Sequence, residues 1–132
     1  MEDKQYFTPN IDDLRLGYKF ELYIHDNWES VTFSQFDIMC YEQFTTCLEK
    51  KEVRTPYLTK EQIEAEGWKF IGNGNCGGVM HGFEKSDFEL SLWDVFCPAH
   101  IEITDCEGNI KFDGECKSIN EFRYICKLLK IN

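Results

Sequence analysis

Three stretches of the chain begin with a helix-capping motif, and in the first and third of them hydrophobic residues recur at helical spacing. In this motif a Ser or Thr side chain accepts a backbone N–H bond, and a residue three positions later returns one. The motifs begin at Ser34, Thr59 and Ser118. The apolar positions that follow them are Phe36, Cys40, Phe44, Cys47 and Leu48; Ile63; and Phe122, Ile125, Cys126 and Leu129. The pattern predicts three amphipathic helices, of which the second ends at Gly67.

Alternating apolar and polar residues predict strands before and between these helices. The clearest alternation covers residues 18–25, and Asp26-Asn27 is predicted to turn the chain into a strand over 28–33. Further strands are expected over residues 68–70, 83–85, 87–93, 101–104 and 110–112, with turns at Ser86-Asp87 and over 106–109. Because the connections are short, neighbouring strands should be antiparallel. The expected fold class is α+β, an antiparallel β meander with three amphipathic helices packed on one face.

The chain is expected to form a single domain over residues 1–132. Within it, an N-terminal hairpin-plus-helix part covers 1–52, and a helix–meander–helix part covers 53–132. The segment 50–56 is interpreted as a linker between these parts. A chain of 132 residues can bury roughly two-thirds of its unfolded surface, whereas about 50 residues alone would form a marginal core.

The charge balance of the chain argues against nucleic acids as direct partners. The chain has 24 acidic and 14 basic residues and a formal net charge of −10, which disfavours direct nucleic-acid binding because that mode needs a basic face. The acidic residues are interspersed with lysines and aromatic residues, which is typical of a solvated surface. No apolar run is long enough to span a membrane, and the first five residues are polar where a signal peptide would be basic and then apolar. A cytoplasmic protein is expected.

Cysteine and histidine spacing suggests one metal site. Seven cysteines without an export signal favour reduced thiols over a disulfide framework. Two pairs combine thiolate with imidazole, Cys76 with His81 and Cys97 with His100, and these are ligand types that zinc prefers. The meander would bring their loops to the same end of the sheet. The alternative is a set of separate buried thiols and surface imidazoles, and no other cofactor is expected.

Two other features suggest binding. Residues 72–78 are rich in glycine, and Asn73 and Asn75 are candidate ligand contacts in this loop because glycine lets backbone N–H groups approach a ligand. No Gly-Lys-Ser/Thr follows, so the loop lacks the context of a phosphate-binding loop. Aromatic residues make up 15% of the chain, and Tyr23, Trp28 and Trp93 are the candidate partner contacts, with core packing as the alternative fate of each.

Residues 53–68, VRTPYLTKEQIEAEGW, follow the approximate pattern Val/Ile-Arg-x-x-Tyr-Leu-x-x-Glu-x-Ile-x-x-x-Gly-Trp/Phe. This segment resembles one that recurs in small uncharacterised bacteriophage and prophage proteins. Residues 112–122 with their helix are similar to the strand and closing amphipathic helix of those proteins, and residues 6–15 are similar to the start of some members. The shared motifs are structural and carry no catalytic residue. The resemblance implies a phage-encoded accessory protein that acts in the bacterial cytoplasm.

These observations lead to one functional hypothesis and two alternatives. No motif for nucleophilic or acid–base catalysis surrounds the cysteines, histidines or carboxylates. We therefore expect a non-enzymatic accessory binding protein that engages a host protein or a small nucleotide, for example to blunt host defence. The alternatives are a virion-associated structural component and a zinc-stabilised interaction module.

Overall fold

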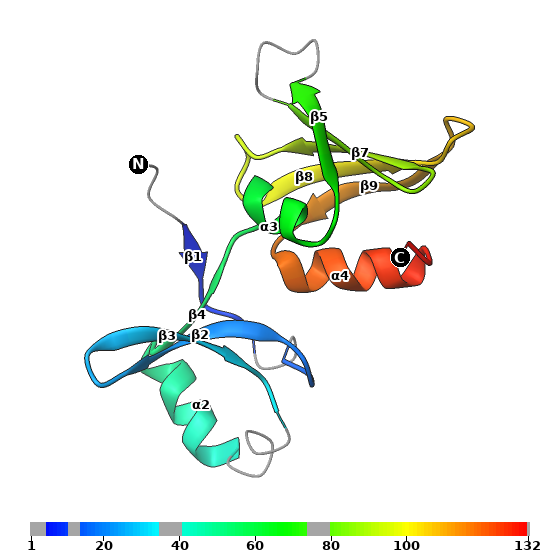
Figure 1. Ribbon diagram of the computed structural model, residues 1–132. Helices are drawn as coiled ribbons and strands as arrows, with labels where there is room; N and C mark the ends of the chain where they lie inside the picture. Colours follow the sequence, from blue (N-terminus) through cyan, green and yellow to red (C-terminus); the bar gives the residue numbers. More distant parts are fainter. Residues whose placement is uncertain (1–4, 11–13, 35–40, 74–79, 132) are drawn as a thin grey trace. The chain divides into compact units, whose positions relative to one another are not determined.

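A computed structural model describes residues 5–10, 14–34, 41–73 and 80–131. The chain divides into two compact units, Met1–Pro56 and Tyr57–Asn132. Over the described residues, each unit combines helix with one antiparallel sheet (Figure 1). This confirms the predicted α+β class. Within the same residues, no helix combines the length and the apolar character needed to cross a membrane.

The first unit places one helix against a sheet whose strand order is β1-β4-β2-β3 over the described residues. Its elements are β1 (Tyr6–Phe7), β2 (Lys19–Ile24), β3 (Asn27–Thr32), α2 (Tyr41–Glu49) and β4 (Val53–Pro56). Phe44 of α2 is buried, and its ring lies 5.5 Å from the ring centroids of both Phe20 and Phe33. These rings, with Tyr18 and Val53, form the core of this unit. The predicted start of the helix after Ser34 falls on residues 35–40, outside the described residues.

Two predictions in this unit were wrong. The β2–β3 turn consists of His25 and Asp26, with φ of 50° and 67°, and Asn27 already pairs with Ile24. Two successive residues with positive φ form the turn type that matches strand twist, so the turn lies one residue earlier than predicted. The segment 50–56 is not a linker, because it contains β4. Its alternation of buried Val53 and Thr55 is short and flanked by charges, which concealed the strand.

The second unit is a meander in which the described strands follow one another in the order β5-β6-β7-β8-β9. Its elements are α3 (Lys60–Ala65), β5 (Lys69–Asn73), β6 (His81–Lys85), β7 (Phe88–Trp93), β8 (Ala99–Thr104), β9 (Ile110–Cys116) and α4 (Ile119–Leu128). Ile63 of α3 and Phe122 of α4 are in one buried cluster with inward-facing residues of the strands, including Phe83, Leu90 and Ile101. Figure 1 shows both helices on the same side of the meander, as predicted.

The cap of α3 agrees with its sequence motif, and the cap of α4 agrees with it in part. Thr59 Oγ1 accepts a bond from the Gln62 backbone N–H at 3.3 Å, and Gln62 Oε1 accepts one from the Thr59 N–H at 3.0 Å. Gly67 follows with φ of 95°. At the start of α4, Ser118 Oγ accepts from the Asn120 N–H at 3.2 Å, but its hydroxyl donates to the Glu121 carboxylate. This second cap therefore differs from the reciprocal motif that the sequence predicted.

Candidate functional site

The face of the first sheet that points away from its core carries a cluster of aromatic and charged residues. Phe20 faces the core, so its neighbour Glu21 and the following odd-numbered residue Tyr23 point to the opposite side. Tyr23 is paired directly with Trp28, and Glu21 with Arg54. Tyr6 pairs with Pro56, which lies two positions after Arg54 on β4 and so on the same side. We call this surface the aromatic–arginine face; its members are Tyr6, Glu21, Tyr23, Trp28 and Arg54.

The Arg54 guanidinium is stacked between two aromatic rings. Its Cζ lies 3.6 Å from the ring centroid of Tyr6 and 4.1 Å from that of Trp28. The row continues to Tyr23, whose ring centroid is 5.2 Å from that of Trp28 at an interplanar angle of 58°. Cation–π attraction stabilises the contacts of Arg54 with Tyr6 and Trp28. Attraction between tilted aromatic rings stabilises the contact of Trp28 with Tyr23. Residues from all four described strands of this sheet therefore form one continuous row.

An ion pair fixes the plane of the guanidinium in this row. Arg54 Nε and Nη2 each lie 2.8 Å from Oε1 of Glu21. The two side chains are 27% and 18% exposed, so the pair is shielded in part from water and salt. The carboxylate neutralises the charge of the guanidinium and fixes its orientation. The guanidinium in turn holds the rings of Tyr6 and Trp28 that stack on it. Tyr23, which is 41% exposed, lies at the open end of the row.

Sequence reasoning found only part of this face. It selected Tyr23 and Trp28, and the structure brings these two together. It did not select Arg54 or Glu21, because Arg54 lies on the segment that was interpreted as a linker. Arg54 lies between two apolar or small residues, Val53 and Thr55. This alternation was the signal that would have placed Arg54 on the side of the sheet away from its core.

The third aromatic candidate lies elsewhere. Trp93 is on β7 of the second unit, and its ring centroid is 5.6 Å from that of His100. Asn75 is outside the described residues, and for Asn73 only the backbone, at the end of β5, is described. Most of the glycine-rich segment lies outside the described residues, so a role in ligand binding stays a prediction there.

The candidate zinc ligands are not brought together where the structure describes them. His81 pairs with the buried Leu92, which places it on the helix-covered side, whereas His100 pairs with Trp93 on the other side. Adjacent positions on a strand point to opposite faces of a sheet, so loops at the same end of the meander do not by themselves bring these two rings together. Cys97 is exposed, and Cys76 lies outside the described residues. Within the described ranges, no three His, Cys, Asp or Glu residues are grouped to hold a metal ion.

Each of these histidines instead contacts an aspartate. His81 Nε2 lies 3.2 Å from Oδ1 of Asp94, and His100 Nε2 lies 2.6 Å from Oδ1 of Asp113. In both pairs the aspartate orients the imidazole. The pairs therefore give each ring a local structural partner on its own side of the sheet.

The thiols of the second unit differ in exposure, and this gives a first testable prediction. Burial raises the pKa of Cys126 to about 11 and raises that of Cys116 further still, whereas Cys97 and Cys106 are exposed. These raised pKa values keep Cys116 and Cys126 protonated at pH 8, and the thiolate is the species that reacts. We expect iodoacetamide to label Cys97 and Cys106 at least about tenfold faster than Cys116 and Cys126 in the native protein.

Peptide mass spectrometry of a labelling time course measures these rates. Labelling in urea is the control, since all four thiols should then react at similar rates. Native labelling of Cys126 as fast as Cys97 would contradict the described packing of α4.

Similarity to known proteins assigns no function to this geometry. Comparison of the chain with protein-family models, with curated proteins and with solved structures found no match. The functional interpretation therefore depends on the arrangement of the residues themselves.

Proposed function

We propose that this protein is a non-enzymatic accessory binding protein of bacteriophage type, which engages a host protein through the aromatic–arginine face. One observation carries the proposal, the row formed by Tyr6, Arg54, Trp28 and Tyr23 on the side of the sheet away from its core. The resemblance of residues 53–68 to segments of small phage proteins supports the phage context. Action in the bacterial cytoplasm belongs to the same proposal.

The composition and rigidity of the face support a protein partner. Tyrosine, tryptophan and arginine are the residue types most enriched among the energetically dominant contacts of protein interfaces. Rings that are already held in place lose little conformational entropy on binding. Trp28 contacts both Arg54 and Tyr23, so it holds the row together and is the residue whose removal should weaken binding most.

Replacing Trp28 with alanine is expected to weaken partner binding by about thirtyfold or more, which corresponds to a dominant interface contact of about 2 kcal/mol. The test captures partners from a bacterial lysate with immobilised protein, identifies them by mass spectrometry and then measures the affinity of the purified partner. A partner retained by the unaltered protein and lost with Trp28→Ala is the expected result.

The matched control is Trp93→Ala, which removes the same side chain from the second unit. This variant should retain the partner, since Trp93 lies on β7 and not on the aromatic–arginine face. Equal retention of the partner by both variants, or equal loss from both, would contradict the proposal. Thermal unfolding of each variant shows whether it is folded in the assay.

A further inference from the structure

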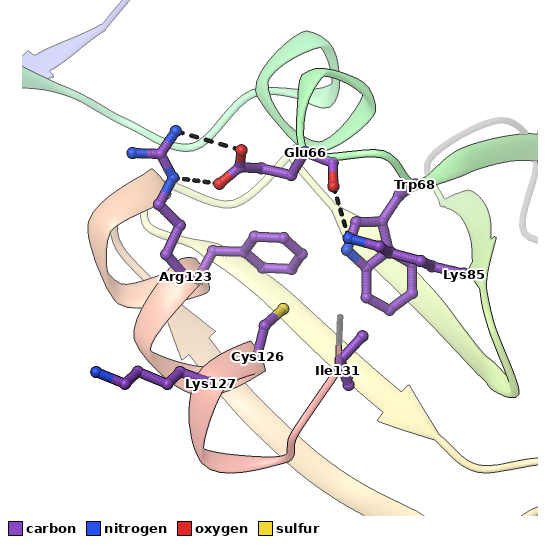
Figure 2. A pocket seen from close by; sticks show the side chains of 8 residues that line it. Glu66, Trp68, Lys85, Arg123, Cys126, Lys127 and Ile131 are labelled. Carbon is purple, nitrogen blue, oxygen red and sulfur yellow. Dashed lines mark hydrogen bonds and ion pairs between the residues drawn. The ribbon is translucent and has the colours of Figure 1, made fainter.

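A pocket of about 310 Å³ lies in the second unit between the α3–β5 segment and α4. Figure 2 shows Glu66 and Trp68 on one side of it, and Cys126 and Ile131 on the side of the C-terminal helix. Trp68, Phe122 and Ile131 belong to the apolar core beneath it. The pocket therefore has an apolar wall, and its other lining residues are mostly charged.

The charge of the lining is opposite to that of the chain. Among the described residues, three cations, Lys85, Arg123 and Lys127, line the pocket together with one carboxylate, that of Glu66, although acidic residues outnumber basic ones in the sequence. Cys126 adds no negative charge at neutral pH, because burial raises its pKa to about 11. The local excess of positive charge favours an anion.

The cations retain donors after their internal contacts are counted. Lys85 Nζ donates to the Glu66 backbone carbonyl at 2.8 Å, and this bond uses one of its three N–H groups. The Arg123 guanidinium holds the Glu66 carboxylate through Nε and Nη2 (Figure 2), which leaves three of its five N–H groups. These contacts orient both cations without satisfying them, and an arginine fork suits carboxylate and phosphate oxygens.

We infer that this pocket binds a small organic oxyanion, a phosphate or carboxylate attached to a compact apolar group. The oxyanion lies against Lys85 and Arg123, with Lys127 at the rim, and the apolar group contacts the wall that contains Trp68. This site is in the second unit and shares no residue with the aromatic–arginine face. The inference therefore goes beyond the proposed function and is tested independently of it.

The probe is phenyl phosphate, which combines a dianion with an aromatic ring. Titration into the full chain at low salt should show binding at one site with a dissociation constant of about 1 mM or below, and 0.5 M NaCl should weaken it. In a ¹H–¹⁵N spectrum the indole N–H of Trp68 should shift, whereas that of Trp28 should not. Inorganic phosphate should bind more weakly because it lacks the apolar group, and phenol should bind more weakly because it lacks the charge.

Variants separate a built site from general attraction to lysines. Lys127→Gln and Lys85→Gln should each weaken phenyl phosphate binding by about threefold to tenfold. Lys69→Gln removes the same charge from an exposed position on β5 that does not line the pocket, and it should leave the affinity unchanged. The Lys127 side chain forms no hydrogen bond or ion pair with the described residues, so Lys127→Gln tests the site without loss of a side-chain contact.

Three results would overturn the inference. The first is the absence of any Trp68 shift at 10 mM phenyl phosphate. The second is an equal loss of affinity in Lys69→Gln and Lys127→Gln, which would indicate non-specific charge attraction. The third is inorganic phosphate binding as tightly as phenyl phosphate, which would exclude a role for the apolar wall. None of these results bears on partner capture through Trp28, so failure of the pocket and failure of the proposed function are distinguishable.

Discussion

Replacing Phe122 with alanine is expected to lower the free energy of unfolding of the second unit by about 3–5 kcal/mol. Phe122 is fully buried, and its ring centroid lies 5.9 Å from that of Trp68. The substitution removes the contact with Trp68 and other apolar contacts in the buried cluster of this unit, and it leaves a cavity there. Urea unfolding followed by tryptophan fluorescence and circular dichroism measures the change.

Leu128→Ala is the control for this prediction. Leu128 is on the same helix but is 62% exposed, so its removal should change the free energy of unfolding by no more than about 0.5 kcal/mol. A loss below about 1 kcal/mol for Phe122→Ala, or equal losses for the two variants, would contradict the described packing of α4 on the meander.

Replacing Phe20 with alanine is expected to destabilise the first unit by a similar amount, about 3–5 kcal/mol. Phe20 is 2% exposed, and its ring meets that of Phe44 edge to face. A unit of this size has a small core, so the loss would be a large fraction of its total stability. Hydrogen exchange should show faster exchange of the β2 and β3 amide groups than in the unaltered protein.

Tyr23→Ala tests the opposite face of the same strand. Tyr23 is 41% exposed and contacts Trp28, so its removal should cost about 1 kcal/mol or less. The pair of variants separates the core side of β2 from the side that carries the aromatic–arginine face. Strong destabilisation by Tyr23→Ala and weak destabilisation by Phe20→Ala would reverse the faces and remove the basis for the aromatic–arginine face.

Much of the second unit could be predicted from the sequence, because its local signals agree with one another. The Thr59 motif, Gly67 and the Ser86-Asp87 turn each specify a local conformation that the structure contains, with Lys85 paired to Phe88 across the turn. The apolar alternation of β7 gives its inward face correctly, with Leu90 and Leu92 buried. Short antiparallel connections then leave little freedom in strand order.

The first unit could be predicted less well, since its sheet depends on pairing between distant segments. β4 pairs with β2 through Val53 and Leu22, thirty-one positions apart in the sequence. No local motif specifies such a contact, and a four-residue strand carries little periodicity of its own. The aromatic–arginine face could not be predicted without this pairing. Only the pairing of β4 with β2 brings Arg54 beside Glu21 and between the rings of Tyr6 and Trp28.

The candidate metal site was predicted from signals that proved insufficient. Residue types and loop positions suggested convergence of Cys76, His81, Cys97 and His100, but strand parity depends on register, which spacing alone does not fix. The structure places His81 and His100 on opposite sides of the sheet. The pocket beside α4 was missed for a related reason, since Glu66, Lys85 and Arg123 come from three separate elements and share no motif.

The central claim is that the aromatic–arginine face contacts a host protein, and site-specific photo-crosslinking tests it most directly. A photoreactive phenylalanine derivative placed at position 23 in bacterial cells is expected to form a covalent adduct with one discrete partner. The same residue at position 124 should form none, although Tyr124 is 47% exposed and Tyr23 41%. An adduct from position 124 with none from position 23, or the absence of an adduct at both, would contradict the claim.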